Sequence, residues 1–155
     1  MDYSTLAEQV RGLGAYKAGV VDLQDVRFDR AFRAMCETNA CGNYGKCWMC
    51  PPDAGDIDAL MNEAQSYQKA LVYQTVGKLE DSYDFEGMIE AARLHNELSR
   101  ALAKWFATLP FAKKLHLGAG GCHMCGVCAK GIRSLRCPLW RLTASTSQSL
   151  PPPAA

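Results

Sequence analysis

The chain has 155 residues, of which 48% are hydrophobic and 21% charged, a composition typical of one globular domain that excludes a wholly disordered chain. No apolar run approaches the roughly 18 residues that a membrane span needs. The first residues also lack the basic and apolar regions of a secretory signal, so we expect a cytoplasmic protein with no membrane association.

Charge is distributed unevenly along the chain, although the formal net charge is only +1. Residues 1–97 carry nine basic and sixteen acidic side chains, whereas residues 98–155 carry eight basic side chains and no acidic one. Such a division indicates that an anionic ligand, partner or cofactor meets the C-terminal part of the chain.

Apolar spacing predicts the elements of the N-terminal half. Residues 3–13 place apolar side chains on one face of a helix, and residues 15–22 have the composition of a short strand. Residues 26–35 fit a strand or a helix equally. After two prolines, Asp53 or Asp56 can cap a second helix, whose apolar side chains again recur at helical spacing.

The C-terminal half predicts a strand, a long helix and another strand, over residues 70–76, 84–108 and 112–118. Elements in this order form a βαβ unit, whose strands are parallel. We therefore expect an α/β or α+β fold with a small mixed sheet, formed by a single domain over residues 1–140. The Ser-, Thr- and Pro-rich tail over residues 141–155 is expected to be disordered.

Eight cysteines fall into two groups, each in a loop of this scaffold. We call them the first cysteine packet (Cys36, Cys41, Cys47 and Cys50) and the second cysteine packet (Cys122, Cys125, Cys128 and Cys137). Disulfides are rare in a reducing cytoplasm, so cysteines clustered in this way indicate metal or redox chemistry. Both loops are therefore predicted to bind metal.

The second packet has the spacing C-x2-C-x2-C, and its fourth cysteine is followed by proline. Bacterial ferredoxins bind 4Fe–4S clusters with this arrangement, although their Cys-Pro follows sooner. Glycines beside the ligands allow backbone N–H groups to approach cluster sulfides, and we predict this cofactor-binding role for Gly118, Gly120, Gly121 and Gly126. Zinc is the alternative metal, although zinc sites more often use two separate C-x2-C pairs.

The first packet has the less diagnostic spacing C-x4-C-x5-C-x2-C, in a loop rich in Asn and Gly that suits wrapping around an ion. Its four thiols are enough for a second metal site. Two alternatives stay open. Either all four local thiols bind one cluster, or Cys47 is not a ligand and a remote group, with Cys137 as the candidate, completes a site of Cys36, Cys41 and Cys50.

Three basic residues, Lys130, Arg133 and Arg136, lie within the second packet. A four-thiolate cluster or zinc site is anionic, so these side chains can offset its charge. Nucleic-acid binding is the rival explanation of the basic residues. It ranks second because Trp140 is the only aromatic side chain near them that could stack on a base.

Two segments resemble a known family. The motif C-x4-C-G-N-Y-G-K-x-W-x-C-P-P runs from Cys36 to Pro52, and G-A-G-G-C-x2-C-x2-C runs from Gly118 to Cys128. Together they resemble a bacterial and archaeal family of predicted metal-binding proteins, which is classed as a domain of unknown function. The resemblance covers about residues 15–138, and it implies a cytoplasmic, cysteine-rich metal or iron–sulfur protein.

These patterns predict a protein that holds one or two 4Fe–4S clusters for electron transfer, or for the maturation of another redox system, with a redox partner protein. The alternative is a zinc-stabilised module that contacts nucleic acid or protein. A third hypothesis is an enzyme with an open iron site in the first packet. No Ser/His/Asp or paired-carboxylate arrangement stands out, so no catalytic residue is predicted and a stand-alone catalyst is disfavoured.

Overall fold

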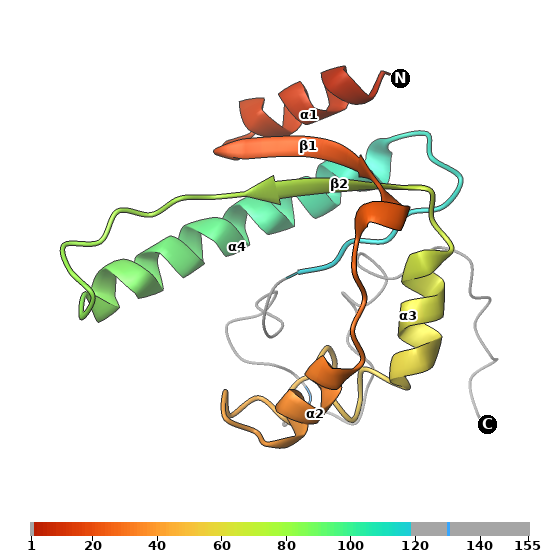
Figure 1. The fold of residues 1–155 in the computed structure, drawn as a ribbon. Coiled ribbons are helices and arrows are strands. Elements are labelled where there is room, and N and C mark those ends of the chain that lie inside the picture. Colours follow the sequence, from red (N-terminus) through yellow and green to blue (C-terminus); the bar gives the residue numbers. More distant parts are fainter. Residues whose placement is uncertain (1, 119–129, 131–155) are drawn as a thin grey trace, which may run out of the picture.

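The fold combines four helices with one pair of strands in the computed structural model, which describes residues 2–118 and residue 130 (Figure 1). The helices are α1 (Tyr3–Gly12), α2 (Ala31–Glu37), α3 (Ile57–Gln65) and α4 (Phe85–Thr108), with a short 3-10 helix η1 (Leu23–Asp25). The strands are β1 (Lys17–Asp22) and β2 (Lys69–Gln74). This mixture confirms the α+β class among the predicted alternatives.

Local signals account for the helices that the sequence predicts, and α1, α3 and α4 are all confirmed. Asp56 caps α3, because its carboxylate accepts a hydrogen bond from the backbone N–H of Ala59 at 2.9 Å. Asp84 caps α4 in the same way, accepting from the N–H of Gly87 at 2.8 Å. Each cap satisfies an N–H group that the first turn of a helix leaves without a partner.

The two strands pair antiparallel, and their last pair lies where a long connection leaves the sheet. Asp22 is opposite Lys69, and their side chains form an ion pair of 2.5 Å. Next to it, the N–H of Leu23 donates to the carbonyl oxygen of Gln68 at 3.0 Å. Residues 23–68 therefore leave and return at one end of the sheet, and they carry α2, the first cysteine packet and α3 (Figure 1).

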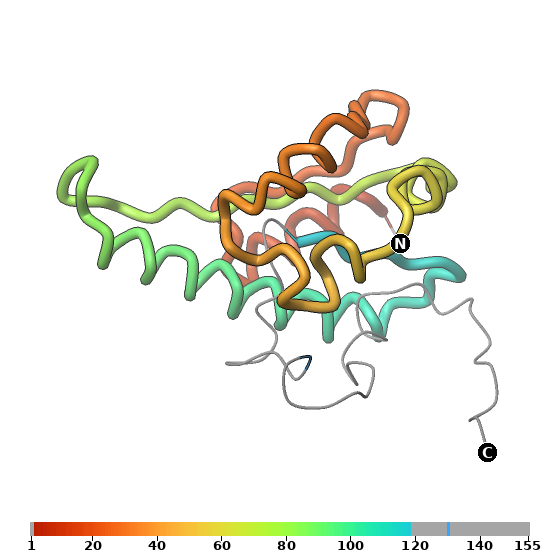
Figure 2. The backbone as a smooth tube through the Cα atoms, turned by 90° about the horizontal axis from the view of Figure 1, so that it is seen from below, coloured from red at the N-terminus to blue at the C-terminus, as the bar shows by residue number. Residues whose placement is uncertain are grey.

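The core lies where α1 and α4 meet one face of the sheet. Its buried cluster consists of Val10, Ala15, Leu98 and Leu102. Side chains from both strands pack against this cluster, and in the pairing register they share one face of the sheet. Beyond the sheet, α4 and residues 75–84 run side by side as a projecting arm (Figure 2).

The strand predicted over residues 112–118 is wrong, and with it the βαβ unit and its parallel strand pair. In the described part of the chain, the sheet is the antiparallel pair alone. Residues 112–118 turn back after α4 and reach the sheet through a side chain, since His116 Nε2 lies 3.3 Å from Tyr73 Oη. Lys114 Nζ donates to the carbonyl oxygen of Leu109 at 2.7 Å, which ties this segment to the end of α4 instead of to a backbone ladder.

Two expectations fall on parts of the chain outside the described residues: the end of the domain at residue 140 and the disordered tail over residues 141–155. Among the helices that the structure describes, none combines the length and apolar character that crossing a membrane requires.

Two histidines flank Tyr73 in a stack between β2, α4 and the returning segment. The Tyr73 ring centroid lies 5.8 Å from that of His95 and 6.4 Å from that of His116, with nearly parallel rings. Burial, and to a smaller extent the nearby His95, lowers the pKa of His116 below its ordinary value of 6.5. The folded protein therefore favours a neutral His116.

This stack predicts a loss of stability in mild acid. Because the pKa of His116 is lowered in the folded state, the unfolded chain binds more protons below pH 6.5. Stability is complete above that value and falls as the pH decreases through it. We expect the urea midpoint to decrease from about pH 7.5 to about pH 5, and to decrease less in His116→Gln. An equal decrease in both proteins would contradict this role of His116.

Candidate metal centre

The first cysteine packet begins on a short helix, and two arginines at this end of the loop bind its other end. The sequence of residues 26–35 fits a strand or a helix. In the structure, the second half of this segment belongs to α2, and this helix also carries Cys36. From the same region, Arg33 Nη2 donates to the carbonyl oxygen of Gly55 at 3.0 Å. Arg30 forms an ion pair of 3.1 Å with Asp58 at the start of α3. These contacts bring the two ends of the cysteine loop together.

Within the loop, residues with left-handed backbone reverse the chain direction. Asn39, Gly42 and Gly45 have φ values of 55°, 73° and 68°. The side-chain oxygen of Asn39 accepts a hydrogen bond from the N–H of Tyr44 at 3.0 Å. The N–H of Gly45 donates across the loop to the carbonyl oxygen of Pro51 at 2.7 Å. The predicted turn-rich loop is thus confirmed, because glycine and asparagine adopt this backbone most readily.

The four thiols of the first packet lie close enough together to affect one another's charge. Cys47 is buried, Cys50 is partly buried, and Cys36 and Cys41 are exposed, with no disulfide among them. Burial raises the pKa of the Cys50 thiol to about 12, and a hydrogen bond with Cys47 and the nearby charges of Cys47, Cys41 and Cys36 add to this shift. Thiols that oppose each other's ionisation in this way are stabilised as thiolates by a bound cation.

The described residues of this loop do not form a complete metal-binding site. Across residues 2–118 and 130, no three Cys, His, Asp or Glu side chains are grouped so that they could hold one metal ion. The loop therefore supplies thiol donors without gathering them around one point. The choice between four local ligands and a site completed by a remote group stays a prediction.

Lys130 connects the two packets. It follows Cys128 by two residues, and its ammonium group lies against the loop of the first packet. Lys130 Nζ donates to the carbonyl oxygen of Gly45 at 2.7 Å and forms an ion pair with Asp53, and both side chains of this pair are only 20% exposed. The same ammonium lies 5.5 Å from the centre of the Trp48 ring. At this point the chain of the second packet therefore meets the first.

Trp48 supplies a further polar group in the loop. Its indole nitrogen is buried and has no hydrogen-bond acceptor among the residues that the structure describes. A buried N–H group without an acceptor is rare and unfavourable, and a sulfur atom of a thiolate-bound metal group would serve as the acceptor. The thiol donors and this N–H therefore fit a metal centre with sulfur ligands.

The remaining predicted site residues are mostly outside the described part of the chain. These are Gly120, Gly121, Gly126 and all four cysteines of the second packet. Gly118 is described, and no atom within the described residues comes within 4 Å of the position that a Cβ would take there. Sequence reasoning missed the ion pair of Asp53 with Lys130. The available signal was the basic residue that follows Cys128 in the second packet.

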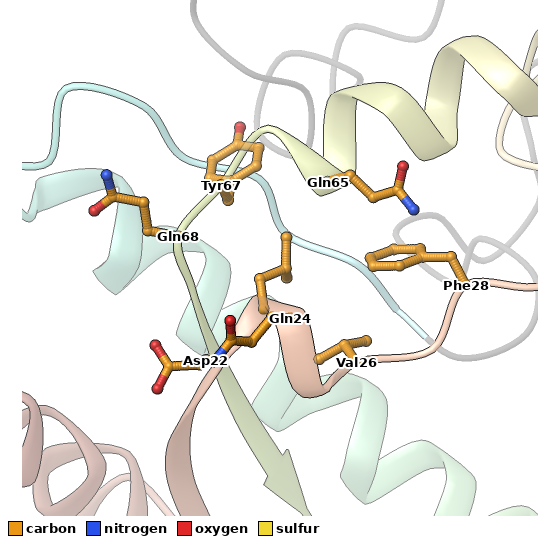
Figure 3. Close-up of a pocket in the computed structure, with 8 residues that line it drawn as sticks. Asp22, Gln24, Val26, Phe28, Gln65, Tyr67 and Gln68 are labelled. Carbon is orange, nitrogen blue, oxygen red and sulfur yellow. The ribbon is translucent and has the colours of Figure 1, made fainter.

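Two hollows lie apart from the cysteines. Figure 3 shows the smaller, a pocket of about 570 Å³ at the base of the long connection, which is lined by Phe28, Tyr67 and three glutamines on different sides of the pocket. The larger is a cavity of about 820 Å³ beside β2, bordered by Tyr73, His95 and His116. Neither lining includes a cysteine, so the first packet is distinct from both.

The fold and the site together define a cysteine-rich α+β protein whose loop is suited to a thiolate-bound metal. The chain belongs to the family described as Predicted metal-binding protein (DUF2284), a domain of unknown function that matches residues 19–138. This match confirms the resemblance seen in the cysteine motifs, and it spans both packets. No curated protein and no solved structure matches the chain significantly.

Proposed function

We propose that the protein holds an iron–sulfur centre of the 4Fe–4S type with thiolates of both cysteine packets, and that it exchanges electrons with a protein partner. The observation that carries this proposal is the contact of Lys130 with the first packet. The second packet contributes the C-x2-C-x2-C spacing, which is typical of iron–sulfur ligation.

Cysteines of the second packet would supply the ligands that the first packet needs to complete a metal site. Its described side chains offer no finished ion site, although they bring four thiols into one loop. In the sequence, Cys128 precedes Lys130 by two residues. This supports one centre, or two adjacent centres, to which both packets contribute. Ferredoxins with two clusters exchange ligands between cysteine runs in a similar way.

The residues of this chain would set the properties of the centre. When bound, an iron–sulfur cluster supplies one-electron transfer. The thiol of Cys47 is buried, which restricts access of water to one side of the loop. The Lys130 ammonium, paired with Asp53, lies against the loop that would hold the anionic centre, and its N–H donors would favour the reduced form. The proposed role is that of a redox partner protein, not a stand-alone enzyme.

Metal and sulfide analysis of protein purified without oxygen tests this proposal. We expect iron and acid-labile sulfide in similar amounts, a brown protein, and a visible absorption that decreases reversibly on one-electron reduction. Colourless protein that contains zinc and no sulfide would contradict the proposal and favour a zinc-stabilised binding module.

A further inference from the structure

Trp48 projects from a turn that two cysteines flank. The N–H of Cys50 donates to the carbonyl oxygen of Cys47 at 3.2 Å, and this hydrogen bond closes the turn around Trp48 and Met49. The indole nitrogen of Trp48 is buried and finds no acceptor in residues 2–118 or 130. The turn therefore places a shielded N–H donor, for which the described residues offer no acceptor, between two cysteines of the first packet.

The indole ring lies beside the ammonium group of a side chain from the other packet. The Lys130 ammonium lies 5.5 Å from the Trp48 ring centre. It is held there by the Gly45 carbonyl oxygen at 2.7 Å and by the carboxylate of Asp53. A cation near an aromatic ring attracts electron density from it, which makes the ring N–H a stronger hydrogen-bond donor. Lys130 thus both positions the ring and polarises its N–H.

We infer that the Trp48 indole N–H donates a hydrogen bond to a metal-bound sulfur of the first cysteine packet, and that Lys130 and Asp53 hold the ring for this purpose. The inference rests on the proposed metal centre but not on the identity of its metal. Trp48 is then a positioning and tuning residue. Its hydrogen bond offsets part of the negative charge on the sulfur, which stabilises the metal-bound thiolate and raises the reduction potential of a redox-active centre.

Cobalt(II) is a probe of sulfur donation whichever metal the protein naturally holds. Full-length protein is stripped of metal, kept reduced and titrated with Co²⁺, and its sulfur-to-cobalt charge-transfer band is recorded. Trp48→Phe keeps an aromatic ring but removes the N–H donor. We expect the band of Trp48→Phe to shift to longer wavelength, because the sulfur loses a hydrogen bond, and the Co²⁺ affinity to decrease about 10-fold. The matched control Trp105→Phe, in α4, leaves band and affinity unchanged.

The outcomes separate this inference from the proposed function. An unchanged band and affinity in Trp48→Phe would overturn the inference, whereas the iron and sulfide assay is independent of it. Lys130→Met is expected to shift the band in the same direction, and by less in the Trp48→Phe background than in the parent. Equal shifts in both backgrounds would contradict the action of Lys130 through the ring. Lys114→Met, at the end of α4, is the matched lysine control.

A measurement on the unmutated protein covers the case in which Trp48→Phe does not fold. In protein labelled with ¹⁵N, the Trp48 indole N–H signal is assigned by elimination with Trp105→Phe and Trp140→Phe. On loading with Cd²⁺, we expect this signal to move downfield and its hydrogen exchange to slow. No change in either quantity on stoichiometric loading would refute the hydrogen bond.

Discussion

Cys50→Ser is expected to abolish metal loading at the first packet and to remove the part of the metal-dependent stability that this loading supplies. Cys50 is the partly buried thiol whose ionisation the other three oppose, and a bound cation would remove that opposition. Binding to a structural site adds directly to folding free energy, by about 10–16 kcal/mol for zinc in isolated fingers. Serine keeps the size of the side chain but is a poor ligand for these metals.

Metal content per chain and the denaturation midpoint with and without metal check this expectation. Cys47→Ser is the informative comparison. If the four local thiols form one site, it loses metal as Cys50→Ser does. If a remote group completes the site, Cys47→Ser loads metal normally.

A loss of metal is also expected at the second packet in Cys122→Ser, Cys125→Ser and Cys128→Ser. Full loading of Cys50→Ser would show that the first packet holds no metal.

Leu102→Ala is expected to destabilise the protein by about 2–5 kcal/mol, because it leaves a cavity in the core. Leu102 is only 4% exposed and belongs to the cluster through which α1 and α4 meet the sheet. Urea unfolding followed by circular dichroism measures the change. Leu94→Ala is the matched control on the same helix: Leu94 is 50% exposed, so its truncation should change stability by no more than about 0.5 kcal/mol. Equal effects would mean that the cluster is not the stabilising core.

Elements with local causes could be predicted from the sequence, including the strands over residues 15–22 and 70–76, and the pairing of the strands could not. The apolar spacing of α4 and its cap at Asp84 lie within one stretch of chain, so their pattern is sufficient. Residues 112–118 alternate in the manner of a strand, but a strand needs a partner whose backbone is within reach. The sequence does not state that β2 pairs with β1, or that Lys114 is bound to the end of α4.

The candidate site, like the fold, has features that the sequence predicts and features that it does not. Its donor chemistry could be predicted, because cysteines at such short spacing have few roles other than metal binding. The contact of Lys130 with Asp53 joins residues 77 positions apart, and no local pattern encodes it. The burial of the Trp48 indole nitrogen likewise depends on what packs around it. Side-chain identity therefore indicated which chemistry to expect, and only the fold showed how the loop is supported.

The narrow base of the long connection has an evolutionary consequence. The first and last residues of this connection, Leu23 and Gln68, are joined by a backbone hydrogen bond. The ion pair of Asp22 with Lys69 lies beside it. An insertion or deletion inside this connection does not change the distance between its two ends, which the sheet sets. Each doubling of the length of such a loop adds only about 0.6 kcal/mol to the entropic cost of closing it. Spacing between the cysteines can therefore drift among relatives, and the loop can adapt to a different metal, while the scaffold that presents it stays the same.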